Sequence, residues 1–415
     1  MSVYMRSPQG QVPVGHLDAD CFYVSAERVR YQNLEGLPVG VLGNQGACVI
    51  AKSYEMKAAG VRTGVPIWEA MEMCPDGLYV KRDFRWYEIL SRLMLDAVRD
   101  LSTRVEYYSI DEFFFDATPP RGKTRQEYAE TIRNRIGEAV RVPVTVGIAR
   151  TRTLAKLISD AAKPSGALAV LDRPAEEALL LDRPVTEITG IAGRRQRRLQ
   201  PWGIKSCLDL ANADRRLVRQ LLTAAGEALW WELRGDPVTP IHPQRTLHKA
   251  LSRGGSFGES TDDPNVLYAW LIRNLERLIE ELEFHAMLTG RLTVWVAYKD
   301  GQVGVGRTDL TVPSDRFDVL LEAARPCLRR AWVPRVRATR MHLIAEKLRP
   351  RAQAQLGLFE PSPERAEALA RLKREVNSRH GRFALRSAAT LPLVSVYRDT
   401  SNAYDICDVR GKSCF

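Results

Sequence analysis

The sequence predicts a multi-domain α+β protein, and three observations lead to this prediction. First, 415 residues with 45% apolar side chains are enough for two to four domains with real cores. Second, residues 14–149 have the order strand, helix, paired strands, helix, strand, which is the split βαβ plan of a ferredoxin-like domain. Third, residues 249–347 repeat this order, after a Leu-, Arg- and Ala-rich stretch with short helical periods at residues 171–235.

Composition and charge restrict the class of protein further. The chain carries 61 Lys and Arg against 50 Asp and Glu, a formal charge of +11, which favours a polyanionic partner such as nucleic acid over a merely basic soluble protein. Seven cysteines without a C-x-x-C pair argue against a disulfide framework or a zinc site. No leader or membrane-spanning run is apparent, so we expect a cytoplasmic protein with no membrane partner.

Two apolar stretches are each interrupted by carboxylates. In residues 105–116 (VEYYSIDEFFFD) the interruption is Asp111 and Glu112, and in residues 16–29 (HLDADCFYVSAERV) it is Asp18 and Asp20. Ionised carboxylates in buried strands are costly unless they are paired or bound to a cation, although a hairpin tip would also accommodate the first pair. Oxygen ligands without a His or Cys cluster suit Mg²⁺, and two such ions about 3.5–4 Å apart are the usual device for phosphoryl displacement.

These residues resemble a known family, the Y-family (translesion) DNA polymerases. In that family a metal-binding Asp is followed by a backbone carbonyl and an aromatic steric gate, and a later strand carries Ser-Ile-Asp-Glu. Asp18, Ala19 and Tyr23 match the first motif, and residues 109–112 match the second. The resemblance covers about residues 14–359 and implies a right-hand polymerase with these parts: palm 1–23 and 81–170 (ferredoxin-like), fingers 24–80, helical thumb 171–235, linker 236–248, α/β little finger 249–347 and C-terminal tail 348–415.

The resemblance implies a site for two Mg²⁺ ions. Asp18, Asp111 and Glu112 would be the catalytic carboxylates and metal ligands, together with the backbone carbonyl of Ala19. We expect Asp18 and Asp111 to bridge both ions and Glu112 to serve one. Because adjacent side chains on a strand point to opposite faces, Asp111 and Glu112 can share a site only if the backbone bends or Glu112 reaches around.

The resemblance also implies contacts to the incoming deoxynucleoside triphosphate. The aromatic ring of Tyr23, beside Phe22, would leave no room for a ribose 2′-hydroxyl, although a core aromatic is the alternative. Tyr54 and Lys57 would contact the triphosphate, unless they are only an exposed helix start. Lys163, before Pro164, would reach the same phosphates, a role compatible with a lysine at a helix C-terminus.

Primer–template DNA would be held by the thumb and the little finger. Residues 188–211 resemble a helix-hairpin-helix, in which Gly190, Ala192 and Arg194 would lie at a backbone phosphate. The usual Gly-hydrophobic-Gly is Gly-Ile-Ala here, so a positive φ at Ala192 would carry a strain unless Gly193 replaces it. Arg253, at the start of the little finger, is predicted to contact DNA without reading its sequence.

The tail contains a peptide that looks like the sliding-clamp (β clamp) motif of bacterial polymerases. Its residues would be Gln355, Leu356, Leu358 and Phe359, of which the last two would fill an apolar groove of the clamp. Length, tail and the Ser-Phe-Gly-Glu opening of the little finger favour the polymerase V (UmuC-like) branch over polymerase IV. In that branch an accessory subunit or a recombinase filament is a possible partner.

The resemblance implies a low-fidelity DNA polymerase that copies past lesions during DNA repair and the SOS-type response. Two alternatives come from other classes. A catalytically silent relative would bind DNA and act as a scaffold, but such relatives usually lack the metal carboxylates. A nucleotidyl cyclase would share the two-metal chemistry, but it would have no use for a thumb, a little finger or a clamp peptide.

Overall fold

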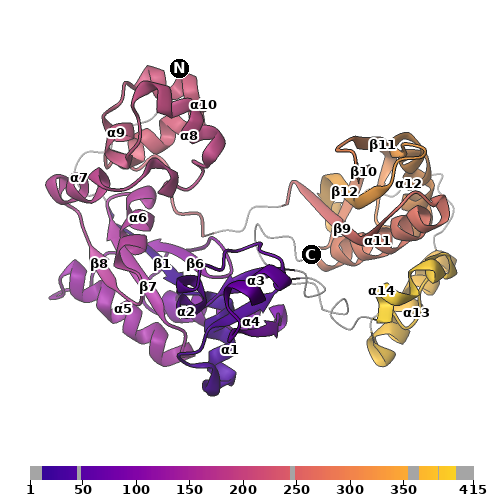
Figure 1. The fold of residues 1–415 in the computed structure, drawn as a ribbon, viewed down its shortest axis with the longest axis horizontal. Coiled ribbons are helices and arrows are strands. Elements are labelled where there is room, and N and C mark those ends of the chain that lie inside the picture. The colour runs from indigo at the N-terminus through magenta and orange to yellow at the C-terminus, as the bar shows by residue number, and fades with distance from the viewer. Residues whose placement is uncertain (1–11, 44–47, 244–247, 354–363, 382, 399–415) are drawn as a thin grey trace. The chain divides into compact units, whose positions relative to one another are not determined.

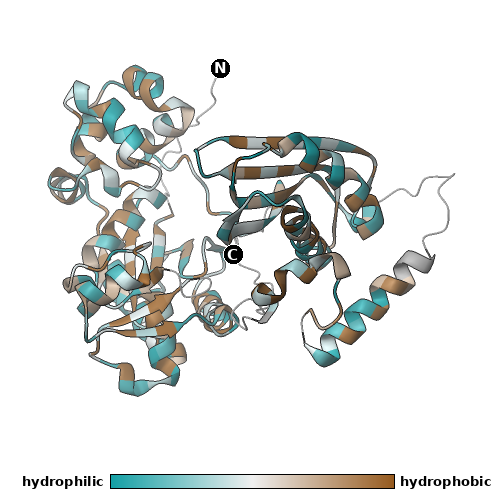
Figure 2. Cartoon of the chain, turned by 45° about the vertical axis from the view of Figure 1, so that its right-hand side comes forward, coloured by the Kyte–Doolittle hydropathy of each residue, from teal (hydrophilic) through white to brown (hydrophobic). Residues whose placement is uncertain are grey.

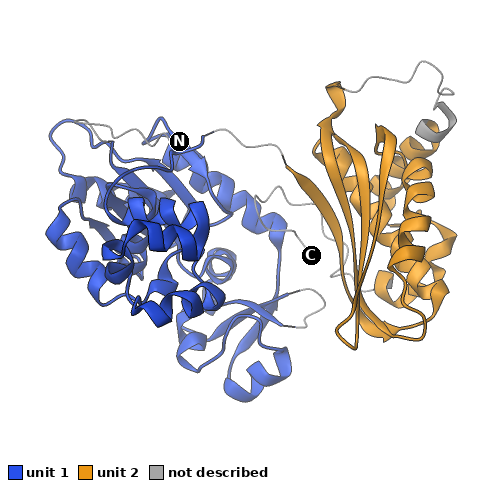
Figure 3. Cartoon of the chain, turned by 90° about the horizontal axis from the view of Figure 1, so that it is seen from above, with its two compact units in different colours: residues 1–245, 409–411 blue, residues 246–408, 412–415 orange. Residues whose placement is uncertain are grey.

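The computed structural model describes residues 12–43, 48–243, 248–353, 364–381 and 383–398. These residues form two compact units (Figure 3), the first ending at residue 245 and the second beginning at residue 246. The division therefore falls inside the predicted linker 236–248. Figure 1 labels the elements of each unit, and we describe the units separately.

A five-stranded sheet, here called the palm sheet, lies at the centre of the first unit, with the strand order β5-β6-β1-β7-β8. Strand β1 is central and pairs antiparallel with both β6 and β7. The order β7-β1-β6-β5 within it is that of a ferredoxin-like split βαβ fold, as the sequence predicted. The strands are β1 Val14–Ala19, β5 Val105–Tyr107, β6 Glu112–Asp116, β7 Val144–Ala149 and β8 Ala167–Ala169.

Four helices accompany the palm sheet, and side-chain caps explain where three of them begin. Thr124 starts α5 with a reciprocal capping box, and Asp83 and Thr151 cap α4 and α6 through their side chains. Helices α5 and α6 pack on the sheet, and α4 packs on α5. The bounds are α1 Phe22–Arg30, α4 Phe84–Arg99, α5 Arg125–Val140 and α6 Arg152–Ala162.

A smaller three-stranded sheet, with the order β3-β2-β4, forms the predicted fingers. Strand β2 pairs antiparallel with β3 and parallel with β4. A small apolar core that includes Val49, Met56 and Val65 lies between this sheet and its helices. The elements are η1 Gln32–Leu34, β2 Val39–Leu42, β3 Val49–Lys52, α2 Tyr54–Ala58, α3 Ile67–Met73 and β4 Leu78–Lys81.

The predicted thumb consists of short helices that share one apolar core with α6 of the palm. Leu154 and Leu157 of α6 belong to the same buried cluster as Leu199 and Leu210 of the thumb. Two Glu232 contacts join these parts, because its carboxylate accepts from Thr153 N (2.9 Å) and its carbonyl accepts from Thr151 Oγ1 (2.8 Å). The elements are α7 Arg173–Leu181, η3 Val185–Glu187, α8 Gly193–Leu199, η4 Gln200–Trp202, α9 Cys207–Asn212 and α10 Arg215–Leu233.

The second unit contains a four-stranded sheet with the order β11-β10-β12-β9, all of whose pairs are antiparallel. Its element order matches that of the palm, but its strand order differs. Helices α11 and α12 cover one face (Figure 3), and the strands alternate between apolar and polar residues (Figure 2). The elements are β9 Ala250–Thr261, α11 Pro264–Phe284, β10 Met287–Tyr298, β11 Val303–Ser314, α12 Phe317–Ala331 and β12 Ala338–Pro350.

The described part of the tail packs on α11. Leu393 joins the core of the second unit, and Lys373 and Arg374 form ion pairs with Glu276 and Glu283 of α11, each at 2.5 Å. The elements are η5 Arg351–Gln353, α13 Glu364–His380, η6 Ala388–Leu393 and α14 Val394–Arg398.

Candidate active site

The palm sheet places two of the predicted catalytic carboxylates side by side. Asp18, near the end of β1, is the direct cross-strand neighbour of Glu112, which begins β6. Asp111 precedes Glu112 in the turn between β5 and β6, and its carbonyl accepts a hydrogen bond from Ala19 N at 2.9 Å. The backbone therefore bends at Asp111, which is the condition that the sequence set for both acids to serve one site. The two acids therefore lie at a hairpin tip, which was one interpretation of the sequence, and this same tip places them beside Asp18, as the metal-site interpretation requires.

Each of the three carboxylates has its own partner. Lys163 Nζ lies 3.0 Å from Asp18 Oδ2 and 2.9 Å from Asp160, Lys156 forms an ion pair with Glu112, and Ser109 donates to Asp111. Within the described residues no three acidic, His or Cys side chains are grouped closely enough to hold a metal ion. The donor set is nevertheless the one that Mg²⁺ prefers, because all of its members are hard oxygen ligands.

Burial dominates the electrostatics at Asp18. It raises the pKa of Asp18 to about 8, even though Lys163 opposes this shift, and the nearby Glu112 raises it further. Burial would lower the pKa of Lys156, but the carboxylate of Glu112 outweighs it, so this pKa lies above its ordinary value. Asp18 is buried and Glu112 is partly buried, and each is paired with an ammonium group that a bound metal ion would replace.

Helix α6 delivers both lysines to the carboxylates. Lys156 lies within the helix and Lys163 ends it, seven residues or about two turns later, so both face β1 and β6. The helix lies close to the sheet because β7 carries Gly147, where a Cβ atom would be 2.4 Å from Ala155 O and from Ser159 N. A glycine at this position is therefore required for the helix to approach the strand.

Tyr23, the predicted steric gate, is supported by other aromatic rings. It stacks on Tyr87 with ring centroids 4.7 Å apart and an interplanar angle of 16°, and it meets Phe84 edge-on at 5.6 Å. Phe22 is 4% exposed and packs against both tyrosines, so only its backbone is available to a nucleotide. The two predicted residues thus differ: Tyr23 is partly exposed, whereas the side chain of Phe22 belongs to the core.

Tyr54 and Lys57 lie together on the short helix α2 of the fingers. Ser53 caps this helix by accepting from Met56 N at 3.2 Å. Tyr54 is 38% exposed, and its hydroxyl donates to Asp20 Oδ1 at 3.3 Å, while Lys57 Nζ lies 6.0 Å from the centre of its ring. Burial and the charge of Asp20 raise the pKa of Tyr54, so its hydroxyl stays protonated as a donor.

In the thumb, the hairpin turn forms without the strain that an alanine could have caused. Gly190 has a φ of 95°, whereas Ala192 is extended, with a φ of −104° and a ψ of −178°. Gly193 is the first residue of α8, so neither a strained alanine nor a shifted hairpin is needed. Arg194 is exposed beside the turn, and Arg195 Nη1 donates to Gly190 O at 2.7 Å.

In the second unit, Arg253 does not occupy an exposed position. It points toward the helices, is 5% exposed and forms an ion pair with Glu281 of α11. The cause is register: Arg253 lies opposite Leu343, a core residue of β12, and therefore faces the same side of the sheet. We correct the expectation of a DNA contact accordingly, and Arg253 leaves the set of proposed DNA contacts.

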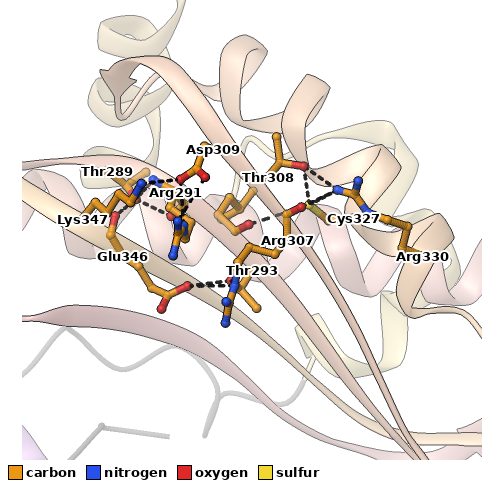
Figure 4. A network of polar contacts seen from close by, with 11 residues as sticks. Thr289, Arg291, Thr293, Arg307, Thr308, Asp309, Cys327, Arg330, Glu346 and Lys347 are labelled. Atoms are coloured by element: carbon orange, nitrogen blue, oxygen red, sulfur yellow. Dashed lines mark hydrogen bonds and ion pairs between the residues drawn. The ribbon is translucent and has the colours of Figure 1, made fainter.

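The opposite face of this sheet carries a polar network that sequence reasoning did not identify (Figure 4). Asp309 lies 2.7 Å from Arg291 and 2.8 Å from Lys347, and Glu346 accepts from Thr293 Oγ1 at 2.7 Å. The two basic neighbours lower the pKa of Asp309. Acidic side chains thus neutralise part of the positive charge of Arg291 and Lys347 on this face.

One further prediction lies outside the described residues. The clamp-like peptide, with Gln355, Leu356, Leu358 and Phe359, falls in residues 354–363 and stays a prediction.

The structure adds Asp20 and Tyr87 to the residues that lie near the candidate active site. No described helix is both long and apolar enough to cross a bilayer.

The fold and the site together define the class of right-hand polymerases, and comparisons with known proteins identify the family. Residues 17–160 match the model of the impB/mucB/samB family, and residues 248–358 match the model of its C-terminal domain. DNA polymerase IV 2 of Mesorhizobium japonicum is 32% identical over 353 residues, which cover 83% of each chain. The chain therefore belongs to the impB/mucB/samB family, the Y-family DNA polymerases.

Relatives of two kinds have similar identities. DNA polymerase IV of Bacillus velezensis is 28% identical over 91% of this chain and 92% of its own length. Protein UmuC of Salmonella typhimurium is 29% identical over 84% of this chain and 86% of its own. These values do not separate the two branches, so the assignment to the polymerase V branch stays a prediction.

Solved structures have the same fold. A Y-family chimera of Dbh and Dpo4 aligns with a TM-score of 0.71 at 23% identity, covering 81% of this chain and 99% of its own. A ternary complex of Dbh aligns with a TM-score of 0.55 at 26% identity, covering 80% and 98%. The predicted fold class is thereby confirmed.

Proposed function

We propose that the protein is a template-directed DNA polymerase that adds deoxynucleotides to a primer 3′ end at a site for two Mg²⁺ ions. The observation that carries this proposal is the cross-strand pairing of Asp18 with Glu112, with the turn at Asp111 hydrogen-bonded to Ala19. These three carboxylates and the carbonyl of Ala19 would hold the metal. When bound, Mg²⁺ supplies charge neutralisation for the triphosphate and lowers the pKa of the attacking 3′-hydroxyl.

The chain's own side chains would bind and orient the nucleotide. Lys163 and Lys57 offer ammonium groups and Tyr54 offers a hydroxyl to phosphate oxygens. The ring of Tyr23, supported from behind by Tyr87, would exclude a 2′-hydroxyl. On metal binding the ammonium groups of Lys156 and Lys163 would give up part of their contact with the carboxylates, and Lys163 would become available to the triphosphate.

Primer–template DNA would be held mainly through its phosphates. The exposed thumb hairpin at Gly190, Ala192 and Arg194 offers backbone N–H groups and guanidinium charge. Solved relatives support this partner, because one of them is described as an insertion ternary complex of a DNA polymerase. A sliding clamp, bound through residues 355–359, and an accessory subunit or recombinase filament complete the proposed partners.

Low-fidelity copying past damaged bases, within DNA repair and the SOS-type response, is the proposed biological role. Its support is the family and the names of the relatives, which include UmuC and MucB. A cytoplasmic location agrees with the five described cysteines, all of which are free thiols.

Primer extension tests the proposal. The purified chain, with Mg²⁺ and four deoxynucleotides, should extend a primer on an undamaged template and past an abasic site. Asp111→Ala should abolish incorporation and leave the Kd for primer–template within a few-fold. Asp116→Asn is the matched control, because this acid lies at the far end of β6, where its carboxylate accepts from Thr118 and its carbonyl accepts from Ser102 Oγ.

Two results would contradict the proposal. Full activity of Asp111→Ala would refute the metal-site assignment. Tight binding of primer–template without extension by the wild type, even when sliding clamp and recombinase are added, would favour the silent scaffold.

A further inference from the structure

A second buried carboxylate, Asp20, lies next to the proposed metal ligands but has a different environment. It occupies the turn between β1 and α1 and is 2% exposed. Its backbone is fixed on both sides, because Asp20 N donates to Pro143 O at 2.9 Å and Asp20 O accepts from Ser25 Oγ at 2.6 Å. Such a buried acid is costly unless donors compensate its charge.

The donors to this carboxylate are neutral and come from three separate segments. Thr145 Oγ1 of β7 donates, at 3.1 Å from Oδ1 and 3.0 Å from Oδ2, and Ser165 N donates to Oδ2 at 2.7 Å. The hydroxyl of Tyr54, from the fingers, donates to Oδ1 at 3.3 Å. Both oxygens are thus engaged by the protein itself, which distinguishes Asp20 from Asp18.

The contact with Ser165 fixes the loop that carries Lys163. Ser165 has a φ of 51°, and a Cβ atom on the next residue, Gly166, would lie 2.0 Å from Ala162 O, so the loop is closely packed. Lys163 leaves the same loop toward Asp18, at 3.0 Å. Asp20 therefore holds one side of the loop while the ammonium group projects from the other.

The contact with Tyr54 is weaker and can be exchanged. A phenol has one proton to donate, so Tyr54 cannot serve Asp20 and a phosphate oxygen at the same time. At 3.3 Å the present bond is longer than the usual O–H···O range of about 2.5–3.0 Å, and an oxygen of a negatively charged phosphate group offers the hydroxyl a strong acceptor at closer range.

We propose that Asp20 is a positioning residue for the incoming nucleotide, because its carboxylate fixes the Lys163 loop and orients the Tyr54 hydroxyl until a triphosphate takes that hydroxyl. This inference rests on the proposed polymerase function and deepens it. It links a fingers residue to a palm loop through a single acid.

The test compares Asp20→Ala with Asp20→Asn. The Kd of the correct deoxynucleotide is measured on a dideoxy-terminated primer–template, together with kcat on an extendable primer and the Tm of each variant. Asp20→Ala should raise the nucleotide Kd about tenfold, the usual scale for a lost charge-assisted hydrogen bond, with kcat within about threefold. Asp20→Asn should stay within about threefold of wild type, because its amide oxygen still accepts from Ser165 N.

Two outcomes would overturn the inference. An unchanged nucleotide Kd in a folded Asp20→Ala variant would reduce Asp20 to a merely structural role. Loss of kcat in Asp20→Asn with intact nucleotide binding would make it a metal ligand instead. Asp116→Asn serves as the control and should leave the nucleotide Kd, kcat and Tm near their wild-type values.

A second variant keeps the test decisive should Asp20→Ala not fold. Thr145→Val keeps the side-chain shape, removes the hydroxyl that contacts both oxygens, and should raise the nucleotide Kd about threefold. An unchanged nucleotide Kd in a folded Thr145→Val variant would count against the inference. Failure of the wild type to bind or incorporate nucleotide would instead contradict the proposed function.

Discussion

The stacking of Tyr23 on Tyr87 predicts that sugar selection depends on a residue outside the nucleotide site. Tyr87 is fully buried, and its ring lies parallel to that of Tyr23, 4.7 Å away. Tyr87→Leu would keep the position apolar but remove the stacked ring. Its hydroxyl partner, Glu27, would retain Arg30 at 2.9 Å, so the variant leaves no unpaired buried acid.

The expected size follows from the energy of an aromatic pair. Such a pair contributes about 0.5–1.5 kcal/mol beyond area burial. If this energy holds the gate in place, its loss should lower the preference for a deoxynucleotide over the matching ribonucleotide by roughly two- to thirteen-fold. The free energy of unfolding should fall by about 1–3 kcal/mol, because a smaller side chain fills the same space.

The assay is the ratio of kcat/KM for a deoxynucleotide to kcat/KM for the matching ribonucleotide. Tyr87→Phe retains the ring and should retain the ratio, whereas Tyr23→Ala should lose most of it. Tyr128→Leu, at another buried tyrosine of the palm, controls for lost stability. Equal ratios in Tyr87→Leu and wild type would refute the idea that Tyr87 supports the gate.

Three other predictions concern stability. Gly147→Ala should lower the free energy of unfolding by about 2–3 kcal/mol, because the new Cβ atom would lie 2.4 Å from the backbone of α6. Chemical denaturation measures this change, and an unchanged denaturation midpoint would contradict the close packing. Arg253→Met should cost about 3–5 kcal/mol, because it removes the guanidinium that pairs with buried Glu281 and leaves that carboxylate with the His285 ring at 3.4 Å. The Kd for primer–template should nevertheless stay within twofold, and a large loss of DNA affinity in the folded variant would restore Arg253 as a contact. Burial lowers the pKa of His16 well below 6.5, so the unfolded chain binds more protons than the folded one, and the free energy of unfolding should fall as pH drops below about 6.5. His16→Phe should flatten this part of the curve of stability against pH. An unchanged slope in the variant would assign the pH dependence to other groups.

The sequence was most informative where residues act locally. The Ser-Ile-Asp-Glu motif predicted the acidic hairpin, and its position relative to Asp18 follows from the pairing of β1 with β6. The helices of the palm also occur in the predicted order, and capping residues such as Thr124 and Thr151 determine where two of them begin.

It was least informative where the outcome depends on pairing at a distance. The two split βαβ patterns look alike in sequence, but the second sheet has the order β11-β10-β12-β9, because the pattern does not specify which strands become neighbours. The inward orientation of Arg253 depends on that same register. The role of Asp20 depends on Thr145 and Ser165, which lie 125 and 145 residues away.

The most direct test of the central claim is the number of metal ions bound at the palm carboxylates. Mn²⁺, as a paramagnetic substitute for Mg²⁺, would be titrated into the complex with primer–template and a non-hydrolysable deoxynucleotide and followed by electron paramagnetic resonance. The account predicts two tightly bound ions for the wild type and fewer for Asp18→Asn and Asp111→Asn, with Asp116→Asn unchanged. Two ions bound equally tightly in all of these variants would contradict it.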